Sequence, residues 1–177
     1  MNRRKPSIGR TSLVIAAAAA GLIAAAGPAQ AGPLPMEPQT TPLPGTDTDG
    51  ADGFCSFPVT VQVFNGQKVT PTTLPNGATE FRSTGHAKAI VTRDDTGESI
   101  TYNISGPGTV TVFPNGSFTI DAAGPNLLWT TVENSAPAGV LQIAYTTGRV
   151  RVAVNDTGNT TSYQLNGHST DVCAALA

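Results

Sequence analysis

FCSFPVTVQVFNG, residues 54–66, contains the sequence patterns that indicate the fold of the protein. Valines alternate with polar residues from Val59 to Val63, which is the period of a strand with one buried face. Cys55 stands just before this strand. Asn65-Gly66 follows it as a turn signal, because both residue types tolerate a positive φ. The stretch indicates a β domain with a cysteine at the start of its first strand.

The same period of two recurs along the rest of the chain. The apolar residues that carry it are Ile100, Tyr102 and Ile104, then Phe118 and Ile120, then Leu141, Ile143 and Tyr145, then Val150, Val152 and Val154. Leu127-Leu128-Trp129 is a continuous apolar run, typical of a more deeply buried strand. Only Val172–Leu176 suggests a helical period, and no segment is long enough for a βαβ crossover. We therefore predict an all-β, antiparallel fold.

Turn signals separate these segments at intervals of about ten residues. They are Asn65-Gly66, Asn76-Gly77, Asp95-Thr96-Gly97, Asn115-Gly116, Asp156-Thr157-Gly158 and Asn166-Gly167, with further breaks at Gly106-Pro107-Gly108 and Gly124-Pro125. We expect residues 54–177 to form one domain, a single antiparallel meander of about eight or nine short strands.

Cys55 and Cys173 are the two cysteines of the chain, and they stand at the two ends of the strand-rich region. A lone cysteine pair behind an export signal is most simply a structural disulfide. The bridge requires Cα atoms within about 7 Å of each other, so the start of the first strand and the tail must be neighbours. A sheet whose first and last strands are adjacent meets that condition. We therefore favour a closed barrel over an open sandwich.

Residues 1–31 have the three parts of a secretory signal peptide. Four basic residues precede an apolar core, Leu13–Ala26, and Ala29-Gln30-Ala31 supplies the small-x-small motif for a cut between Ala31 and Gly32. The core is shorter than the roughly 20 residues of a membrane-spanning helix. We expect cleavage, no membrane anchor afterwards, and a secreted, extracellular protein. The Sec route is favoured over twin-arginine export.

Loss of the leader changes the charge of the protein. The full chain has 10 basic and 12 acidic residues, and the leader holds four of the basic ones, so the mature protein carries about −6. Nucleic acid and anionic lipid are therefore poor partners. Residues 32–53 contain five prolines and almost no large apolar residue. They predict a disordered linker, which is either a spacer or a tolerated tail.

Three stretches of the chain resemble a group of small secreted actinobacterial proteins of uncharacterised function. They are FCSFPV (54–59), TRDDTGESITYNISGPG (92–108) with FPNGS after it, and the tail GHSTDVCAALA (167–177). The resemblance covers most of residues 54–177 and includes both cysteines. It implies secretion and a small β domain, and it implies no activity.

Gly167–Asp171, GHSTD, partly matches the nucleophile elbow G-x-S-x-G. Asp171 replaces the last glycine, no α/β-hydrolase unit surrounds the motif, and His86 would be the one histidine left as a base. We interpret the stretch as a turn that delivers Cys173 to Cys55. His86 and His168 are too far apart in the sequence to suggest a metal site, so we expect His86 on a solvated strand face.

Two loops have a partial resemblance to ligand-binding loops. Asp47–Gly53 has the acidic spacing of a calcium loop, but Ala51 and Pro58 stand where oxygen ligands are needed, so an acidic end of the linker is expected. Gly106-Pro107-Gly108 lacks the lysine and the helix of a phosphate loop. Neither is predicted to bind a ligand.

Charged and amide side chains supply the remaining candidates. Glu80, Glu98 and Glu133 cannot be assigned to a glycosidase pair, because separation in space decides that role. Arg149 and Arg151 share one strand face, where they either meet an anion or protect the sheet from edge pairing, and protection is favoured. The sequons at Asn103, Asn115, Asn155 and Asn159 lie in turns and need no glycan in a bacterial protein.

No catalytic, cofactor or metal site is therefore predicted. The favoured function is a secreted, non-catalytic binding or cell-surface-associated module with an unknown ligand or surface partner. The alternative is a small barrel enzyme, an isomerase, cyclase or hydrolase, or a small-molecule carrier with an interior pocket.

Overall fold

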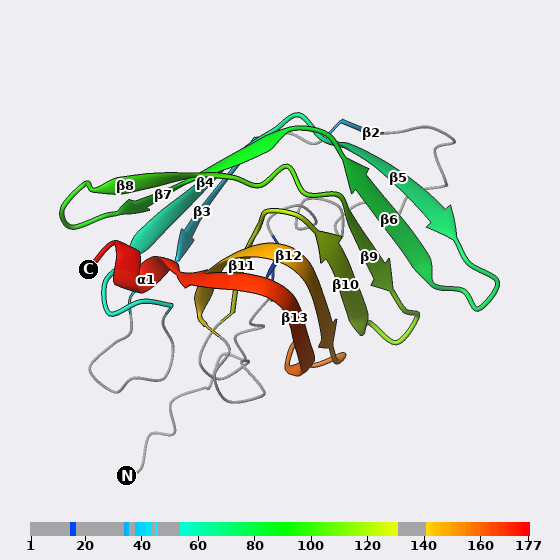
Figure 1. Cartoon of the computed structure of the whole chain (residues 1–177). Coiled ribbons are helices and arrows are strands. Elements are labelled where there is room, and N and C mark those ends of the chain that lie inside the picture. Colours follow the sequence, from blue (N-terminus) through cyan, green and yellow to red (C-terminus); the bar gives the residue numbers. More distant parts are fainter. Residues whose placement is uncertain (1–14, 17–33, 36–37, 44, 46–53, 131–140) are drawn as a thin grey trace, which may run out of the picture.

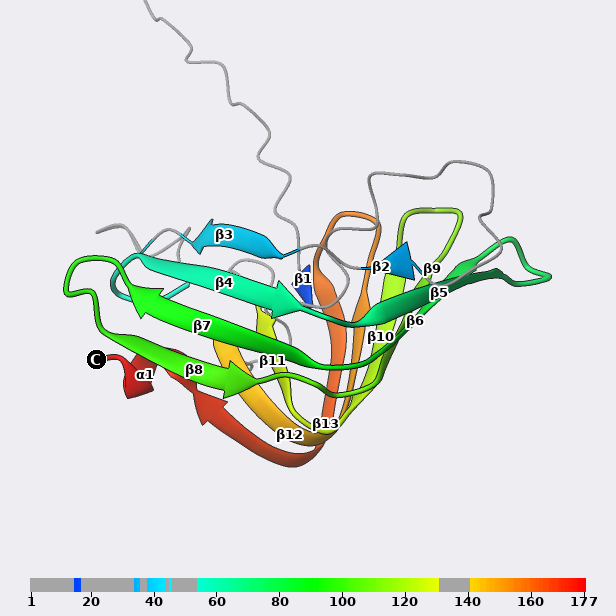
Figure 2. The same cartoon turned by 90° about the horizontal axis from the view of Figure 1, so that it is seen from above.

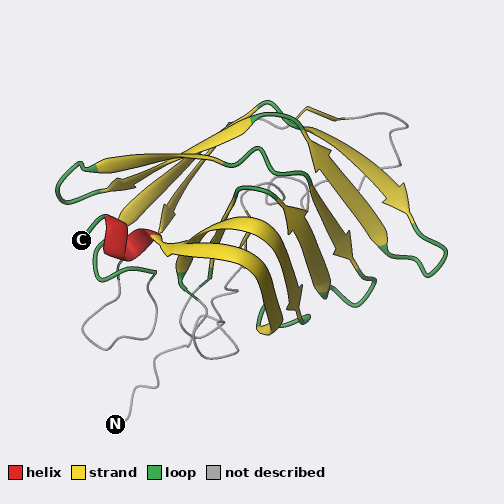
Figure 3. Cartoon of the chain, in the orientation of Figure 1, coloured by secondary structure: helices red, strands yellow, loops and turns green. Residues whose placement is uncertain are grey.

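The computed structural model describes residues 15–16, 34–35, 38–43, 45, 54–130 and 141–177, and strands dominate these residues (Figures 1 and 3). All strand pairs in the described chain are antiparallel, so the predicted all-β, antiparallel class is confirmed. The position between Ala31 and Gly32, the acidic loop Asp47–Gly53 and Glu133 lie outside the described residues, as does nearly all of the predicted leader.

The strands form two sheets. The larger has the order β1 (Ile15–Ala16), β11 (Asn126–Trp129), β12 (Ile143–Val154), β10 (Phe118–Ala123), β9 (Gly108–Val112), β6 (Thr79–Thr84), β5 (Lys68–Thr73) and β2 (Leu34–Pro35), and β13 (Thr160–Asp171) also pairs with β12. The smaller has the order β3 (Gln39–Leu43), β4 (Val59–Asn65), β7 (Ala87–Arg93) and β8 (Ser99–Asn103). A short helix, α1 (Val172–Ala175), follows β13.

The expected single meander and closed barrel are wrong. Two sheets are present, and neither closes within the part of the chain that the structure describes. The predicted disulfide is confirmed: Cys55 and Cys173 are bonded, with their Cα atoms 5.4 Å apart. Cys55 lies before β4 and Cys173 lies in α1, so the bond joins a loop to a helix. Such a bond does not determine which strands are neighbours, so the disulfide did not require the sheet to close into a barrel.

Glycines mark the places where the chain bends between the two sheets, or between two parts of the larger sheet. β4 leads into β5 through Gly66, β6 into β7 through Gly85, β8 into β9 through Gly106, and β10 into β11 through Gly124, while β12 and β13 contain Gly148 and Gly167. We call these six residues the glycine seam. Figures 1 and 2 show that the two long strands, β12 and β13, curve strongly. Strands that switch sheets at such bends make the corners of packed β structures.

Gly148 and Gly167 are directly opposite each other in the β12–β13 pair. A Cβ atom at Gly148 would lie 2.2 Å from the carbonyl oxygen of Asn166, and one at Gly167 would lie 1.8 Å from that of Thr147. The φ of Gly148 is also +103°, a conformation that glycine adopts without steric cost. Both strands can therefore bend at this pair only because neither residue has a side chain.

Two separate apolar clusters lie on the two sides of the seam. The first, in what we call the stapled half, packs the smaller sheet against β11, the start of β12 and α1, and includes Val59, Val61, Val91, Leu127, Trp129, Ile143 and Val172. The second, in what we call the sheet half, lies on one face of the larger sheet and includes Val110, Phe118, Ile120, Val150, Val152 and Val154. In the stapled half the two sheets pack face to face, and Tyr102 stacks on Tyr145 across them at 4.6 Å.

The register of the larger sheet continues through the seam. Ala123 pairs with Arg149 before it and Asn126 pairs with Thr146 after it, with no shift between the two pairs. Alternate residues therefore stay on one face along β12. Ile143 faces the core of the stapled half, whereas Arg149 and Arg151 on the same face are exposed. One face of the sheet thus changes from apolar to polar at the seam.

Four of the six predicted hairpins are confirmed, namely those between β5 and β6, β7 and β8, β9 and β10, and β12 and β13. Asn65-Gly66 and Asn166-Gly167 lie instead at bends of the seam. The same conformational freedom that closes a hairpin also lets a long strand change direction, so the sequence signal did not distinguish the two.

The predicted linker is not structureless where the structure describes it. Gln39–Leu43 form β3, which pairs with β4 over its whole length, and Leu43 is buried. β3 is the outer strand of the smaller sheet. An outer strand tolerates a proline such as Pro42, because one of its edges needs no hydrogen-bond donor.

Candidate functional site

Polar side chains cover the face of the sheet half opposite its apolar cluster. Directly paired residues of an antiparallel sheet point to the same side. One row of such pairs runs across five strands and consists of Thr70, Arg82, Thr109, Asp121 and Arg151, and the next row consists of Thr72, Glu80, Thr111, Thr119 and Ala153. We call the surface formed by these two rows, together with Lys68, Thr84 and Arg149, the polar face.

A recess of about 580 Å³ lies on the polar face, and Glu80, Arg82, Thr109, Thr111, Asp121 and Arg149 are among the residues that line it. A second recess, of about 520 Å³, shares Glu80, Arg82 and Thr84 with the first. Ligand sites commonly have volumes of roughly 300–1,000 Å³, although they are usually more apolar than this one. The size of these recesses suits an extended polar ligand lying across the strands.

Asp121 holds both arginines that the sequence placed on one strand face. Arg149 donates from Nε and Nη2 to the two carboxylate oxygens at 2.8 and 2.7 Å, and Arg151 donates from Nε at 3.2 Å. The hydrogen bond from Arg149, followed by that from Arg151, lowers the pKa of Asp121, although desolvation opposes this shift. All three side chains are at least one-third exposed. Exposed pairs contribute little stability, so their main effect is to orient the guanidinium groups.

Basic residues are concentrated on this surface. Six basic residues follow residue 31, and four of them, Lys68, Arg82, Arg149 and Arg151, lie on the polar face. Among the acidic residues that the structure describes, Glu80 and Asp121 are the two that lie there. The polar face therefore carries about +2 while the protein without its leader carries about −6. The sequence pattern indicated the two arginines but not the surface around them, because it does not show that β5 pairs with β6, β6 with β9 and β9 with β10.

The carboxylates of the polar face do not form an acid–base pair. A glycosidase needs one carboxyl group whose pKa is raised, so that it can donate a proton. The pKa of Asp121 is instead lowered, and Glu80 accepts a hydrogen bond from Arg82 at 2.6 Å. Glu98 lies in the stapled half, between β7 and β8. The structure thus brings no two of the predicted glutamates together among the residues that it describes.

The two histidines and the serine of the hydrolase-like motif lie apart from the recesses. His86 is exposed at the bend between β6 and β7, and His168 and Ser169 are exposed within β13. The interpretation of Gly167–Asp171 as a turn is wrong, because these residues form the end of a strand. Asp171 then caps α1 by accepting a hydrogen bond from the Ala174 amide. No group of three or more metal-ligating side chains occurs among the described residues.

The sequons have a structural explanation in turns. The Oδ1 atoms of Asn103, Asn115 and Asn155 each accept a hydrogen bond from the amide two residues later, that of Ser105, Ser117 and Thr157 respectively. These are Asx-turns, which an Asn followed by a small hydroxyl residue forms readily. Gly106-Pro107-Gly108 is likewise structural, since it connects β8 to β9.

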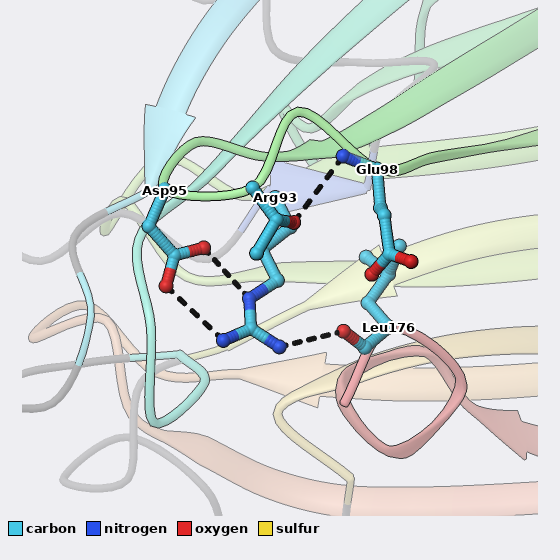
Figure 4. A network of polar contacts seen from close by, with 5 residues as sticks. Arg93, Asp95, Glu98 and Leu176 are labelled. Atoms are coloured by element: carbon cyan, nitrogen blue, oxygen red, sulfur yellow. Dashed lines mark hydrogen bonds and ion pairs between the residues drawn. The ribbon is translucent and has the colours of Figure 1, made fainter.

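Arg93 closes the stapled half near the disulfide (Figure 4). Its Nε and Nη2 atoms donate to Asp95 at 2.7 and 3.1 Å, and its Nη1 donates to the carbonyl oxygen of Leu176 at 3.1 Å. The guanidinium group also lies 4.1 Å from the centre of the Phe57 ring. This basic residue therefore holds the C-terminal segment in place and is not a candidate for ligand binding.

None of the helices in the described part of the chain is long and apolar enough to span a membrane. Comparison with known protein families, characterised proteins and solved structures finds no match to this chain. What the polar face does must therefore be argued from its own residues.

Proposed function

We propose that the protein is a secreted, non-catalytic binding module and that its polar face is the ligand-binding surface. The observation that carries the proposal is the concentration of four of the six basic residues after residue 31 on one sheet face that also contains the two recesses. Charges spread for solubility alone would have no reason to gather on one side of an acidic protein.

Secretion is supported by the leader and by the disulfide. A basic start, an apolar core and a small-residue cleavage motif are the parts of a signal peptide. A disulfide between Cys55 and Cys173 is consistent with an oxidising compartment. The resemblance to small secreted actinobacterial proteins agrees with export, and association with the cell surface would follow from a ligand located there.

A binding role is favoured over the enzyme and carrier alternatives. Both alternatives required a barrel with an interior pocket, and the two described sheets do not close. The recess between Ile104, Val110 and Leu127, at the seam, has a volume of only about 20 Å³. A small-molecule site needs roughly 300 Å³ or more. The two recesses of the polar face are larger than this, and both carboxylates of that face are paired with arginines.

Export is tested by expressing the full chain in a bacterial host and sequencing the N-terminus of the protein recovered from the medium. We expect it to begin at Gly32. Retention in the cell with residues 1–31 intact would contradict the secretion part of the proposal.

The binding surface is tested with the secreted protein on an array of neutral and acidic oligosaccharides. We expect binding to at least one of them, and we expect Thr109→Trp to abolish it, because Thr109 lines the recess. The matched control is Thr101→Trp, which adds the same bulk at an exposed position of β8. Equal binding by both variants, or no binding by the unmodified protein, would contradict a binding role for the polar face.

A further inference from the structure

We infer that the ligand of the polar face is an acidic polysaccharide, a chain of hydroxyl-bearing sugar units that also carries anionic groups. The inference rests on the proposed function, since it names the ligand class of the same surface. It is carried by three features of that surface: unpaired guanidinium donors, a row of threonine hydroxyls, and a width that exceeds one sugar unit.

The first feature is the set of unused donors. Arg82 and Arg151 use only Nε for their carboxylate partners, so the Nη1 and Nη2 atoms of both have no partner among the residues that the structure describes. A guanidinium group matches the geometry of a carboxylate or phosphate by donating two parallel hydrogen bonds. Glu80 and Asp121 hold the Nε sides of these groups. The outer nitrogens are thus the ones available to an anionic ligand.

The second feature is the hydroxyl array. The two rows of the polar face contain five threonines between the charged residues, namely Thr70, Thr72, Thr109, Thr111 and Thr119. A hydroxyl both donates and accepts hydrogen bonds, as do the hydroxyl groups of a sugar. No aromatic side chain belongs to the two described rows of this face. Stacking, on which the binding of nucleic-acid bases depends, is therefore not offered, and charge must supply most of the affinity.

The third feature is the width. Each row crosses five strands, and adjacent strands are about 4.8 Å apart, so a row extends over about 19 Å. This distance exceeds the length of one sugar ring and corresponds to several linked units. The remainder of the protein is acidic and repels a polyanion. Both conditions favour a chain that lies along the rows on this one face.

The experiment separates sugar from charge with three probes. Polygalacturonate has both sugar hydroxyls and carboxylates, dextran has the sugar without the charge, and polyphosphate has the charge without the sugar. With the secreted protein at low ionic strength, we expect polygalacturonate to bind at least about tenfold more tightly than dextran, since one charge-assisted hydrogen bond contributes about that factor. We also expect it to bind more tightly than polyphosphate, which has no hydroxyl groups for the threonine side chains to contact.

Two single-charge variants provide the matched comparison. Arg151→Gln is expected to weaken the binding of polygalacturonate about tenfold, whereas Lys88→Gln removes one exposed positive charge from β7 in the smaller sheet and should change it less than about twofold. Circular dichroism checks that each variant is folded.

Three outcomes would overturn the inference. Equal binding of polyphosphate and polygalacturonate would mean that the face attracts charge alone. Equal effects of Arg151→Gln and Lys88→Gln would mean that the polar face is not the site of the anion. Binding of dextran that is blocked by Thr109→Trp but unchanged by Arg151→Gln would overturn the acidic ligand and leave the proposed function standing. If neither Thr109→Trp nor Arg151→Gln changed binding, the proposed function would be contradicted.

Discussion

The stapled half and the sheet half differ in how their strands are held. In the stapled half two sheets pack face to face, and the disulfide and Arg93 fix the first and last segments of the domain together. In the sheet half all described strands belong to one sheet, which has an apolar face and the polar face. Its polar side chains therefore remain accessible. The comparison suggests that the stapled half is the scaffold and that the sheet half presents the recognition surface.

The largest expected effect is loss of the staple. Replacing both cysteines, Cys55→Ser with Cys173→Ser, opens a loop with a sequence separation of 118 residues. The chain-entropy model assigns about 5 kcal/mol to a loop of this length. Urea denaturation should show that loss. Amide hydrogen exchange should become faster in β4 and β7 than in β9 and β10. If exchange accelerated equally in both halves, the division into a stapled half and a sheet half would be contradicted.

The next largest effect is expected at the seam. Gly148→Ala adds a Cβ atom 2.2 Å from a carbonyl oxygen at a positive φ, so it should cost about 3 kcal/mol of unfolding free energy. Gly97→Ala is the matched control, because its φ is also positive but nothing lies within 4 Å. It should cost only about 1 kcal/mol. Equal losses of stability in the two variants would show that the positive φ of Gly148 accounts for the loss and that the nearby carbonyl oxygen does not.

Buried valines allow the two cores to be compared with the same chemistry. Val59 in the stapled half and Val150 in the sheet half are both 0% exposed. Each change to alanine should cost about 2 kcal/mol, from lost burial and the cavity that remains. Thermal or urea unfolding of the two variants measures this directly. A clearly smaller loss for Val150→Ala would show that the apolar face of the sheet half is less tightly covered.

The smallest effect is expected from acid. Arg93 lowers the pKa of Asp95 in the stapled half, and Arg149 lowers that of Asp121 in the sheet half, chiefly through hydrogen bonds. A carboxyl group with a lowered pKa stabilises the folded state above its ordinary value of 3.8, and this is lost as the pH falls through the folded value. Because both pairs are exposed, the loss should be small. An NMR titration in which the Asp121 midpoint does not rise in Arg149→Gln would contradict the assigned cause.

Local features of the fold were predictable from the sequence. The alternation from Val59 to Val63 and the distant cysteines gave the strand class and the disulfide, because each depends on short-range pattern or on residue type. Four turn signals were also assigned correctly. These inferences needed no knowledge of which strands are neighbours.

The arrangement of the sheets and the polar face were not predictable. Asn65-Gly66 reads the same in a hairpin and in a bend, so the switch of β4 into β5 was missed and a closed meander was expected. Arg82, Asp121 and Arg151 are far apart in the sequence and share a surface only through the register of three strand pairs. Register depends on tertiary packing, and a single sequence does not display it.

The bond between Cys55 and Cys173 makes the domain a covalent ring in topological terms. A single proteolytic cut at an exposed turn, such as Asn115-Gly116 between β9 and β10, opens the ring without separating it into two molecules. The two new ends stay attached through the disulfide, and the strands on either side can keep their partners. A protein with this connectivity would tolerate one nick in its loops, and a gel run without reductant would show it at undiminished mass.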